Sequence, residues 1–215
     1  MKPVQPIVVR PSTHLETIAA AALASGLALA AADPASEPWA SWLGGSFTKS
    51  VRRAKRPVEL DKVRLLDLPW AEISVGGATA IGFAPLDAAG FPPAIKRLQV
   101  TGLDLPVEGT VPAGGCFGHP GALVPLVELN ADVAMSTGKA AAQAAHAPGA
   151  WLLTLGPSAR RTWADEPGLH LGTASFAQDA EKPASIVITD NGLTEIAPGT
   201  RTARVAHLGP AAGGR

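Results

Sequence analysis

The C-terminal part of the sequence predicts an α/β fold, on three observations. Residues 122–129 have the composition of a buried strand, and an alanine-rich helix follows them from Gly138. The β-branched run 184–189 is typical of a central strand, and a turn at 190–192 separates it from a last strand at 201–207. The order of strand, helix, strand, turn and strand indicates an α/β sandwich.

Composition and charge narrow the class of protein. The 215 residues are 47% hydrophobic and 17% charged, and 18 basic residues balance 18 acidic ones. We therefore expect a globular chain without the overall positive charge of many nucleic-acid-binding domains. Aromatic residues make up only 5% and tyrosine is absent, so small and aliphatic side chains must build the core.

The first third of the chain predicts two helices separated by the proline-containing segment 33–38. Ser12 or Thr13 followed by Glu16 resembles a capping box that opens a soluble helix. The apolar run 18–32 could instead be a secretory leader, because basic residues precede it, but it is shorter than the ~20 residues of a membrane span. We favour the soluble helix and expect no membrane association.

The single cysteine, Cys116, excludes an internal disulfide and favours a reducing, cytoplasmic location. Cys116 and His119 supply two zinc ligands, but a closed site needs four and no second pair stands nearby. We therefore expect Cys116 to lie in a loop and the site to use no metal.

A basic cluster follows an apolar helical pattern. The apolar residues are Trp39, Trp42, Leu43 and Phe47, and the basic ones are Lys49, Arg52, Arg53, Lys55 and Arg56. We interpret the two patterns as one helix with a basic C-terminal end, where cations interact favourably with the helix dipole. A patch for the phosphate backbone of a nucleic acid is the alternative, because five positive charges in eight residues exceed what helix stability requires.

Short extended segments are predicted from residue 65 onward. The segments 71–75 and 78–83 flank Gly76-Gly77 and predict a hairpin, and 97–103 is a further extended piece. A Pro- and Gly-rich passage at 106–121 is the predicted domain boundary.

This boundary divides the chain into an N-terminal α+β segment, 1–121, and a C-terminal domain, 122–215. Within the C-terminal domain, Pro148 and Gly149 are expected to end the helix. We expect a loop at 156–161 and an extended segment at 169–176.

Three polar side chains interrupt the alanine-rich helix. Lys139, Gln143 and His146 are spaced i, i+4 and i+7, within about 60° of one another on the helix surface. A phosphate-binding P-loop is excluded, because neither its first glycine nor its Ser or Thr is present. Free backbone N–H groups at the helix start, together with the Lys139 ammonium, predict an anion site, and a solvated polar stripe is the alternative.

The loop 190–200 carries a second candidate constellation. Asp190 follows a strand and precedes a glycine turn, which is where α/β proteins hold functional groups. Thr194 is near enough in sequence to share a turn hydrogen bond with Asp190, so a self-stabilising Asx turn is the structural alternative.

Taken together, the two stretches resemble a known family. The family is the second class of peptidyl-tRNA hydrolase, the archaeal and eukaryotic type, which has two paired sequence signatures. This chain resembles them at Gly138-Lys139-x-Ala141-Ala142-Gln143-x-x-His146-Ala147 and at Asp190-x-Gly192-x-Thr194-x-Ile196-Ala197-Pro198-Gly199. The resemblance covers residues 123–208. The N-terminal segment resembles extensions seen on actinobacterial members, at Trp42, Phe47-Thr48-Lys49 and Val51-Arg52-Arg53.

The resemblance implies a fold, a reaction and a set of site residues. The fold is a three-layer sandwich, in which helices cover both faces of a small mixed β-sheet, and members are often homodimers. The reaction is hydrolysis of the ester that joins a peptide to the terminal ribose of tRNA, with tRNA as the partner and no cofactor. The catalytic positions are Lys139, His146, Asp190 and Thr194, and Gly138 and Gln143 support substrate binding.

These side chains suit ester hydrolysis chemically. Asp190 is expected to orient or deprotonate the attacking water, and Lys139 to stabilise negative charge on the carbonyl oxygen or on a phosphate. His146 is expected to contact substrate or to carry a proton near neutral pH. The sequence does not determine which of these residues is the general base.

The chain departs from the family pattern in two places. In the stretch just before Gly138, three positions that are basic in the family are neutral in this chain, which has Asn130-x-Asp132-Val133-Ala134-Met135-Ser136-Thr137. We therefore expect weaker contacts with tRNA there. We expect Arg52, Arg53 and Lys55 to supply substrate contacts instead, with the N-terminal segment folded back beside the site. The interval between the two signatures is also short, which predicts that a helix is missing from one face.

Two other functions stay open. A non-catalytic RNA-binding or regulatory relative would keep the fold and the anion site, whereas a hydrolase for a different acyl substrate would keep the catalytic groups. Hydrolysis of peptidyl-tRNA is the leading hypothesis. This hypothesis requires that the side chains of four residues converge on one cleft, namely Asp190, Thr194, Lys139 and His146.

Overall fold

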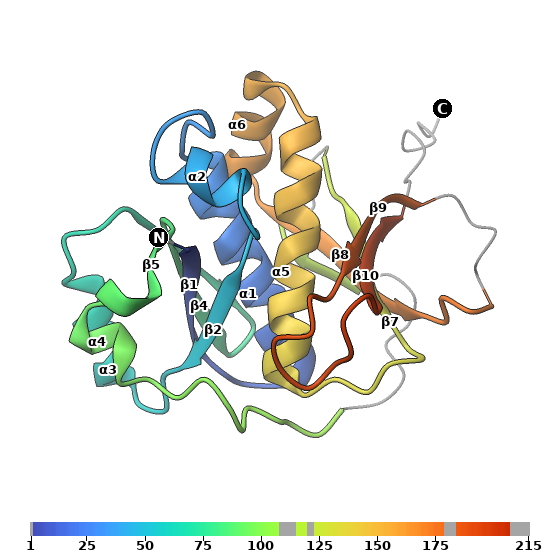
Figure 1. Ribbon diagram of the computed structural model, residues 1–215, viewed down its shortest axis with the longest axis horizontal. Coiled ribbons are helices and arrows are strands. Elements are labelled where there is room, and N and C mark those ends of the chain that lie inside the picture. Colours follow the sequence, from blue (N-terminus) through green and yellow to red (C-terminus); the bar gives the residue numbers. More distant parts are fainter. Residues whose placement is uncertain (1, 108–114, 120–122, 179–183, 207–215) are drawn as a thin grey trace.

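A computed structural model describes residues 2–107, 115–119, 123–178 and 184–206. Two β-sheets enclose a central layer made by two long helices, α1 (His14–Ala30) and α5 (Thr137–Thr154) (Figure 1). The predicted α/β class is therefore confirmed. The order of layers differs from the expected sandwich, because the two helices lie between two sheets and do not cover the outer faces of one.

The N-terminal sheet has the strand order β2-β1-β4-β3, and β5 pairs with β1. Its strands are β1 (Pro3–Arg10), β2 (Lys49–Arg53), β3 (Trp70–Val75), β4 (Ala78–Phe83) and β5 (Leu86–Asp87). β1 runs parallel to β2 and antiparallel to β4. The predicted hairpin is confirmed as β3 and β4, joined at Gly76, whose φ of 53° suits glycine.

The C-terminal sheet has the order β6-β8-β7-β10-β9. Its strands are β6 (Gly115–Gly118), β7 (Leu126–Asn130), β8 (Gly168–Ala174), β9 (Ala184–Thr189) and β10 (Arg201–Ala206). β7 and β8 are parallel, and the other pairs are antiparallel. The predicted strands exist, although residues 122 and 207 at two of their ends lie outside the described residues. β9 is an edge strand and not the central strand that its β-branched residues predicted. Such a composition indicates a strand, but it does not determine the position of that strand in the sheet.

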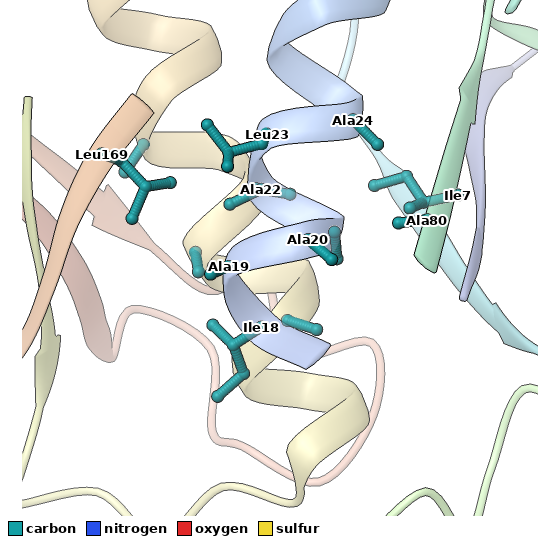
Figure 2. Close-up of a cluster of buried hydrophobic side chains, with 14 of the residues drawn as sticks. Ile7, Ile18, Ala19, Ala20, Ala22, Leu23, Ala24, Ala80 and Leu169 are labelled. Atoms are coloured by element: carbon teal, nitrogen blue, oxygen red, sulfur yellow. The ribbon is translucent and has the colours of Figure 1, made fainter. Parts of the chain in front are cut away.

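Helix α1 begins as the sequence predicts. The Thr13 hydroxyl accepts a hydrogen bond from the Glu16 amide at 3.3 Å and caps the helix. Alanine at seven of its 17 positions lets α1 lie close to both sheets, and Figure 2 shows Ile7 and Ala80 on one side of it and Leu169 on the other. Among the described residues, no helix has the length and hydrophobicity needed to cross a membrane.

Short helices complete the fold, namely α2 (Trp39–Leu43), α3 (Pro57–Arg64), α4 (Pro93–Lys96), α6 (Pro157–Asp165) and the 3-10 turn η1 (Ala88–Gly90). The prediction that the basic cluster ends a helix is wrong. Residues Lys49–Arg53 form β2, since they pair with β1 and bury Val51. The segment 97–103 forms no strand beyond a single bridge between Arg53 and Gln99.

Two predictions about the end of α5 are also wrong. The helix continues through Pro148 to Thr154, because Pro148 removes only one hydrogen bond and the buried Leu152 beyond it anchors the last turns in the core. The expected loop at 156–161 is the start of α6, with Gly156 as its cap and proline in its first turn.

The main hydrophobic core spans the predicted domain boundary. It joins residues of α1 and the N-terminal sheet to residues of α5 and the C-terminal sheet. Most of the boundary segment 106–121 lies outside the described residues, so a division at residue 121 stays a prediction. The shared core fixes α5 against β2, which determines where the polar stripe of α5 lies.

Candidate functional site

The polar stripe of α5 faces a cavity of about 610 Å³. The cavity lies between α5, the start of β2, the segment 100–104 and the chain that leaves β9. Residues from both predicted parts of the chain line it. The charged and titratable groups among them are Lys49, Asp104, Lys139, His146, Asp190 and Glu195.

Backbone hydrogen bonds fix Asp190 at the end of β9. Its amide donates to the carbonyl oxygen of Thr200 at 2.8 Å, and its own carbonyl oxygen accepts from the Gly199 amide at 2.8 Å. The Gly192 amide donates to Asp190 Oδ1 at 2.7 Å, with Gly192 at a φ of 74° that glycine adopts without strain. The expected Asx-type turn is therefore present, and it holds the carboxylate in place.

Two side chains contact this carboxylate, and a third contacts one of them. Asp190 Oδ2 accepts a hydrogen bond from Gln143 Nε2 at 2.7 Å and forms an ion pair with Lys139. Lys139 Nζ also donates to the Thr194 hydroxyl at 2.8 Å. The Asp190 and Lys139 side chains are only 4% and 10% exposed, so the ion pair forms in a poorly hydrated place where electrostatic interactions are strong. The structure thus brings Lys139, Gln143, Asp190 and Thr194 together.

His146 lines the same cavity, one helical turn beyond Gln143. Its ring packs against Phe47 with centroids 5.1 Å apart, and within the described part of the chain neither ring nitrogen has a hydrogen-bond partner. Burial lowers the pKa of His146 well below 6.5, and the positive charges of Lys49 and Lys139 lower it further. The imidazole is therefore neutral at pH 7.

At the start of α5, where an anion site was predicted, other groups of this chain already use the backbone donors of Ser136, Gly138 and Lys139. The Gly138 amide donates to the carbonyl oxygen of Leu103 at 2.8 Å, and the Lys139 amide donates to Ser136 Oγ at 3.3 Å. Glu195 Oε1 accepts from both the amide and the hydroxyl of Ser136. A carboxylate of the protein thus occupies the place at the helix start where a ligand anion was expected.

The basic residues expected to contact substrate do not line the cavity. The Arg52 guanidinium donates to carbonyl oxygens at the end of α4, among them that of Lys96 at 3.2 Å. Arg53 donates to Gly102 O at 2.9 Å and to Gln99 Oε1 at 2.6 Å. Lys55 is exposed. The two arginines therefore hold in place the segment that forms one cavity wall. This structural role accounts for both arginines, and no contact with a ligand is needed to explain them.

Sequence reasoning did not select two residues of the site. The Thr202 hydroxyl donates to Gln143 Oε1 at 2.6 Å from β10, and no local pattern distinguishes it from any other strand threonine. Lys49 belonged to the basic cluster but was not among the expected substrate contacts, although its place two residues after Phe47 and near Trp42 was a usable signal. Cys116 is exposed, and among the described residues no group of three or more His, Cys, Asp or Glu side chains is arranged to bind a metal.

Comparisons with models of protein families, with curated proteins and with solved structures found no match for this chain.

Proposed function

We propose that this protein hydrolyses the ester between a peptide and the terminal ribose of tRNA, in the cytoplasm. One observation carries the proposal, namely that Lys139 bridges Asp190 and Thr194 on the wall of an open cavity. The two sequence signatures that resemble the hydrolase family come from distant parts of the chain, and their polar residues lie in one place. A homodimer stays a prediction.

Asp190 is suited to orient the attacking water. A carboxylate has about four acceptor sites, and Asp190 accepts from Gly192, Gln143 and Lys139. The remaining site is available for one proton of a water molecule. These contacts suit Asp190 to orient the water, and we assign the transfer of the water proton to the neutral His146 imidazole, which lines the same cavity.

Thr194 and Lys139 are suited to stabilise the carbonyl oxygen. The Thr194 hydroxyl accepts from Lys139 Nζ, so its own proton is free to be donated to that oxygen as negative charge develops on it. The water oxygen then bonds to the carbonyl carbon, the bond to the ribose oxygen breaks, and the protonated His146 returns its proton to the ribose oxygen. The products are tRNA and the carboxylic acid of the peptide, which releases the second water proton to solvent and becomes a carboxylate.

The test is turnover of an N-blocked aminoacyl-tRNA by wild type, by Asp190→Asn and by Asp165→Asn. Asp190→Asn keeps the size of the side chain and removes its charge, and we expect hydrolysis to fall by about 10²-fold or more. Asp165 is exposed on α6 and does not line the cavity, so its variant should match wild type.

Each other outcome contradicts the proposal in a different way. Equal rates for Asp190→Asn and wild type would remove Asp190 from the mechanism. Absence of turnover in wild type, with tRNA binding retained, would favour a non-catalytic RNA-binding protein. Hydrolysis of simple acyl esters without activity on acylated tRNA would favour an esterase for a different substrate.

A further inference from the structure

Lys49 lines the cavity from the start of β2, and its side chain holds a second amine beside α5. Its Nζ donates to Gln5 Oε1 at 2.6 Å and to Ser25 Oγ at 2.8 Å, and it lies over the rings of Trp42 and Phe47, 4.5 and 4.8 Å from their centroids. A protonated amine has three N–H groups. Two of them are used by these neutral partners, and the third is left for a ligand.

No carboxylate of the described residues balances the charge of Lys49. The acidic groups of the cavity wall are engaged elsewhere. Asp190 pairs with Lys139, Glu195 accepts hydrogen bonds at the start of α5, and Asp104 interacts with His14 at the start of α1. When Lys49 is protonated, its end of the cavity is therefore the most positive region of the lining.

We propose that Lys49 binds a phosphate group of the ligand, which makes this end of the cavity a phosphate subsite. The inference rests on the proposed function, because it assigns to this subsite the 5′-phosphate of the nucleotide whose ribose carries the ester. A charged amine surrounded by aromatic rings and neutral acceptors gains a strong, charge-assisted hydrogen bond when an anion arrives.

The spacing along α5 suits such a ligand. Lys49 Nζ lies 3.8 Å from where a methyl group on Gly149 would stand, whereas Gln143 contacts Asp190. Six residues separate Gly149 from Gln143, which is about 9 Å of helix. In one nucleotide only the short chain C3′, C4′, C5′ and O5′ lies between the ester oxygen and the phosphate. An ester at Asp190 and a phosphate at Lys49 are thus compatible with a single nucleotide lying along the helix, past His146.

The enclosure of Lys49 adds a measurable signature. Burial lowers the pKa of Lys49 well below the ordinary 10.5, so the free protein holds this proton weakly, and a bound phosphate would favour the protonated form. The other titratable or charged groups facing the cavity are Asp104, Lys139, His146, Asp190 and Glu195. A variant of Lys49 alone separates its proton uptake from theirs.

The experiment is calorimetric titration of the full chain with 5′-AMP and with adenosine, each in two buffers that differ in ionisation enthalpy. We expect wild type to bind AMP about tenfold or more tightly than adenosine, with net proton uptake specific to AMP. Lys49→Met should bind both probes with the affinity of wild type for adenosine and should lose the AMP-specific uptake. Retained adenosine binding shows that this variant is folded.

Lys62→Met is the matched control, since Lys62 is an exposed lysine on α3 that does not line the cavity, and it should behave as wild type. The inference is overturned if wild type shows no preference for AMP, or if Lys49→Met keeps that preference. Hydrolysis of an N-blocked aminoacyl-tRNA is measured in parallel. A Lys49-dependent AMP preference without hydrolysis would contradict the proposed function alone, and hydrolysis with an AMP preference independent of Lys49 would contradict this inference alone.

Discussion

The side-chain amide of Gln143 donates to the carboxylate of Asp190 at 2.7 Å, although 47 residues separate the two in the chain. The Thr202 hydroxyl donates to Gln143 Oε1, which fixes the orientation of the amide, so that its NH₂ group faces Asp190. All three residues are buried. Gln143 therefore acts by positioning the carboxylate of Asp190, and this role requires no direct contact with a ligand.

Replacing Gln143 by leucine should destabilise the protein by about 1–3 kcal/mol, because it leaves buried polar groups of Asp190 and Thr202 without their partner. Urea denaturation measures the change. Gln178→Leu is the control, since Gln178 is exposed. If both variants unfold at the same urea concentration, the hydrogen bonds of Gln143 do not contribute to stability.

Thr194 gives a test at the level of catalysis. Under the proposed function, Thr194→Val removes the hydroxyl that would donate to the carbonyl oxygen, and we expect kcat to fall by about 10²-fold or more. Thr194→Ser keeps the hydroxyl and should keep most of the activity. Hydrolysis of an N-blocked aminoacyl-tRNA is the assay, and a fully active valine variant would exclude this role.

The depressed pKa of His146 predicts how stability depends on pH. The unfolded chain binds a proton near pH 6.5, whereas burial and two lysine charges keep folded His146 neutral to lower pH. Stability should therefore rise with pH between the folded pKa and about 6.5, and this contribution should be lost as pH falls below 6.5. For one histidine the change between pH 7 and pH 5 is up to about 2 kcal/mol.

Unfolding free energies at pH 5 and pH 7 check this prediction. His14 also has a lowered pKa, through burial opposed by the charge of Asp104, and it contributes with the same sign. His146→Leu should reduce the difference between the two pH values, and His146→Leu with His14→Gln should reduce it further. An unchanged difference in the double variant would show that neither histidine is held neutral.

The sequence predicts local features of the fold better than their arrangement. The cap at Thr13 and the hairpin around Gly76-Gly77 depend on a few adjacent residues and are confirmed. Strand β1, the continuation of α5 past Pro148 and the place of α1 between two sheets depend on contacts between distant segments. No period or turn signal in the sequence contains that information.

The same distinction holds for the site. The spacing of Lys139, Gln143 and His146 predicts one helical stripe, and the cavity faces that stripe. The roles of Arg52 and Arg53 could not be predicted, because their partners, backbone carbonyl oxygens and the side chain of Gln99, lie 43 to 49 residues away. A basic residue has the same appearance in a sequence whether it binds phosphate or fastens a loop.

Close contact between α1 and β4 should make Gly82 intolerant of a side chain. A methyl group at Gly82 would lie 2.4 Å from the carbonyl oxygen of Ala24, so Gly82→Ala must separate helix and sheet, at a cost of about 1–3 kcal/mol. Gly90→Ala is the control, because its methyl group would meet no atom closer than 4.0 Å. Thermal unfolding of both variants measures the difference, and equal melting temperatures would contradict the close contact.

Thr137 fastens one wall of the cavity at the start of α5. Its hydroxyl oxygen accepts a hydrogen bond from the Leu105 amide at 2.9 Å and lies 2.9 Å from His14 Nδ1. Thr137→Val keeps the shape and removes the hydroxyl, so the segment around Leu105 should open more often. Native-state hydrogen exchange should show faster exchange of the Leu105 amide. The Gly138 amide, which donates to Leu103 O, is an internal reference. If the Leu105 amide keeps its protection in the valine variant, the Thr137 hydroxyl does not hold this wall, and the burial of Leu103 and the hydrogen bonds of Arg53 and Gly138 hold it instead.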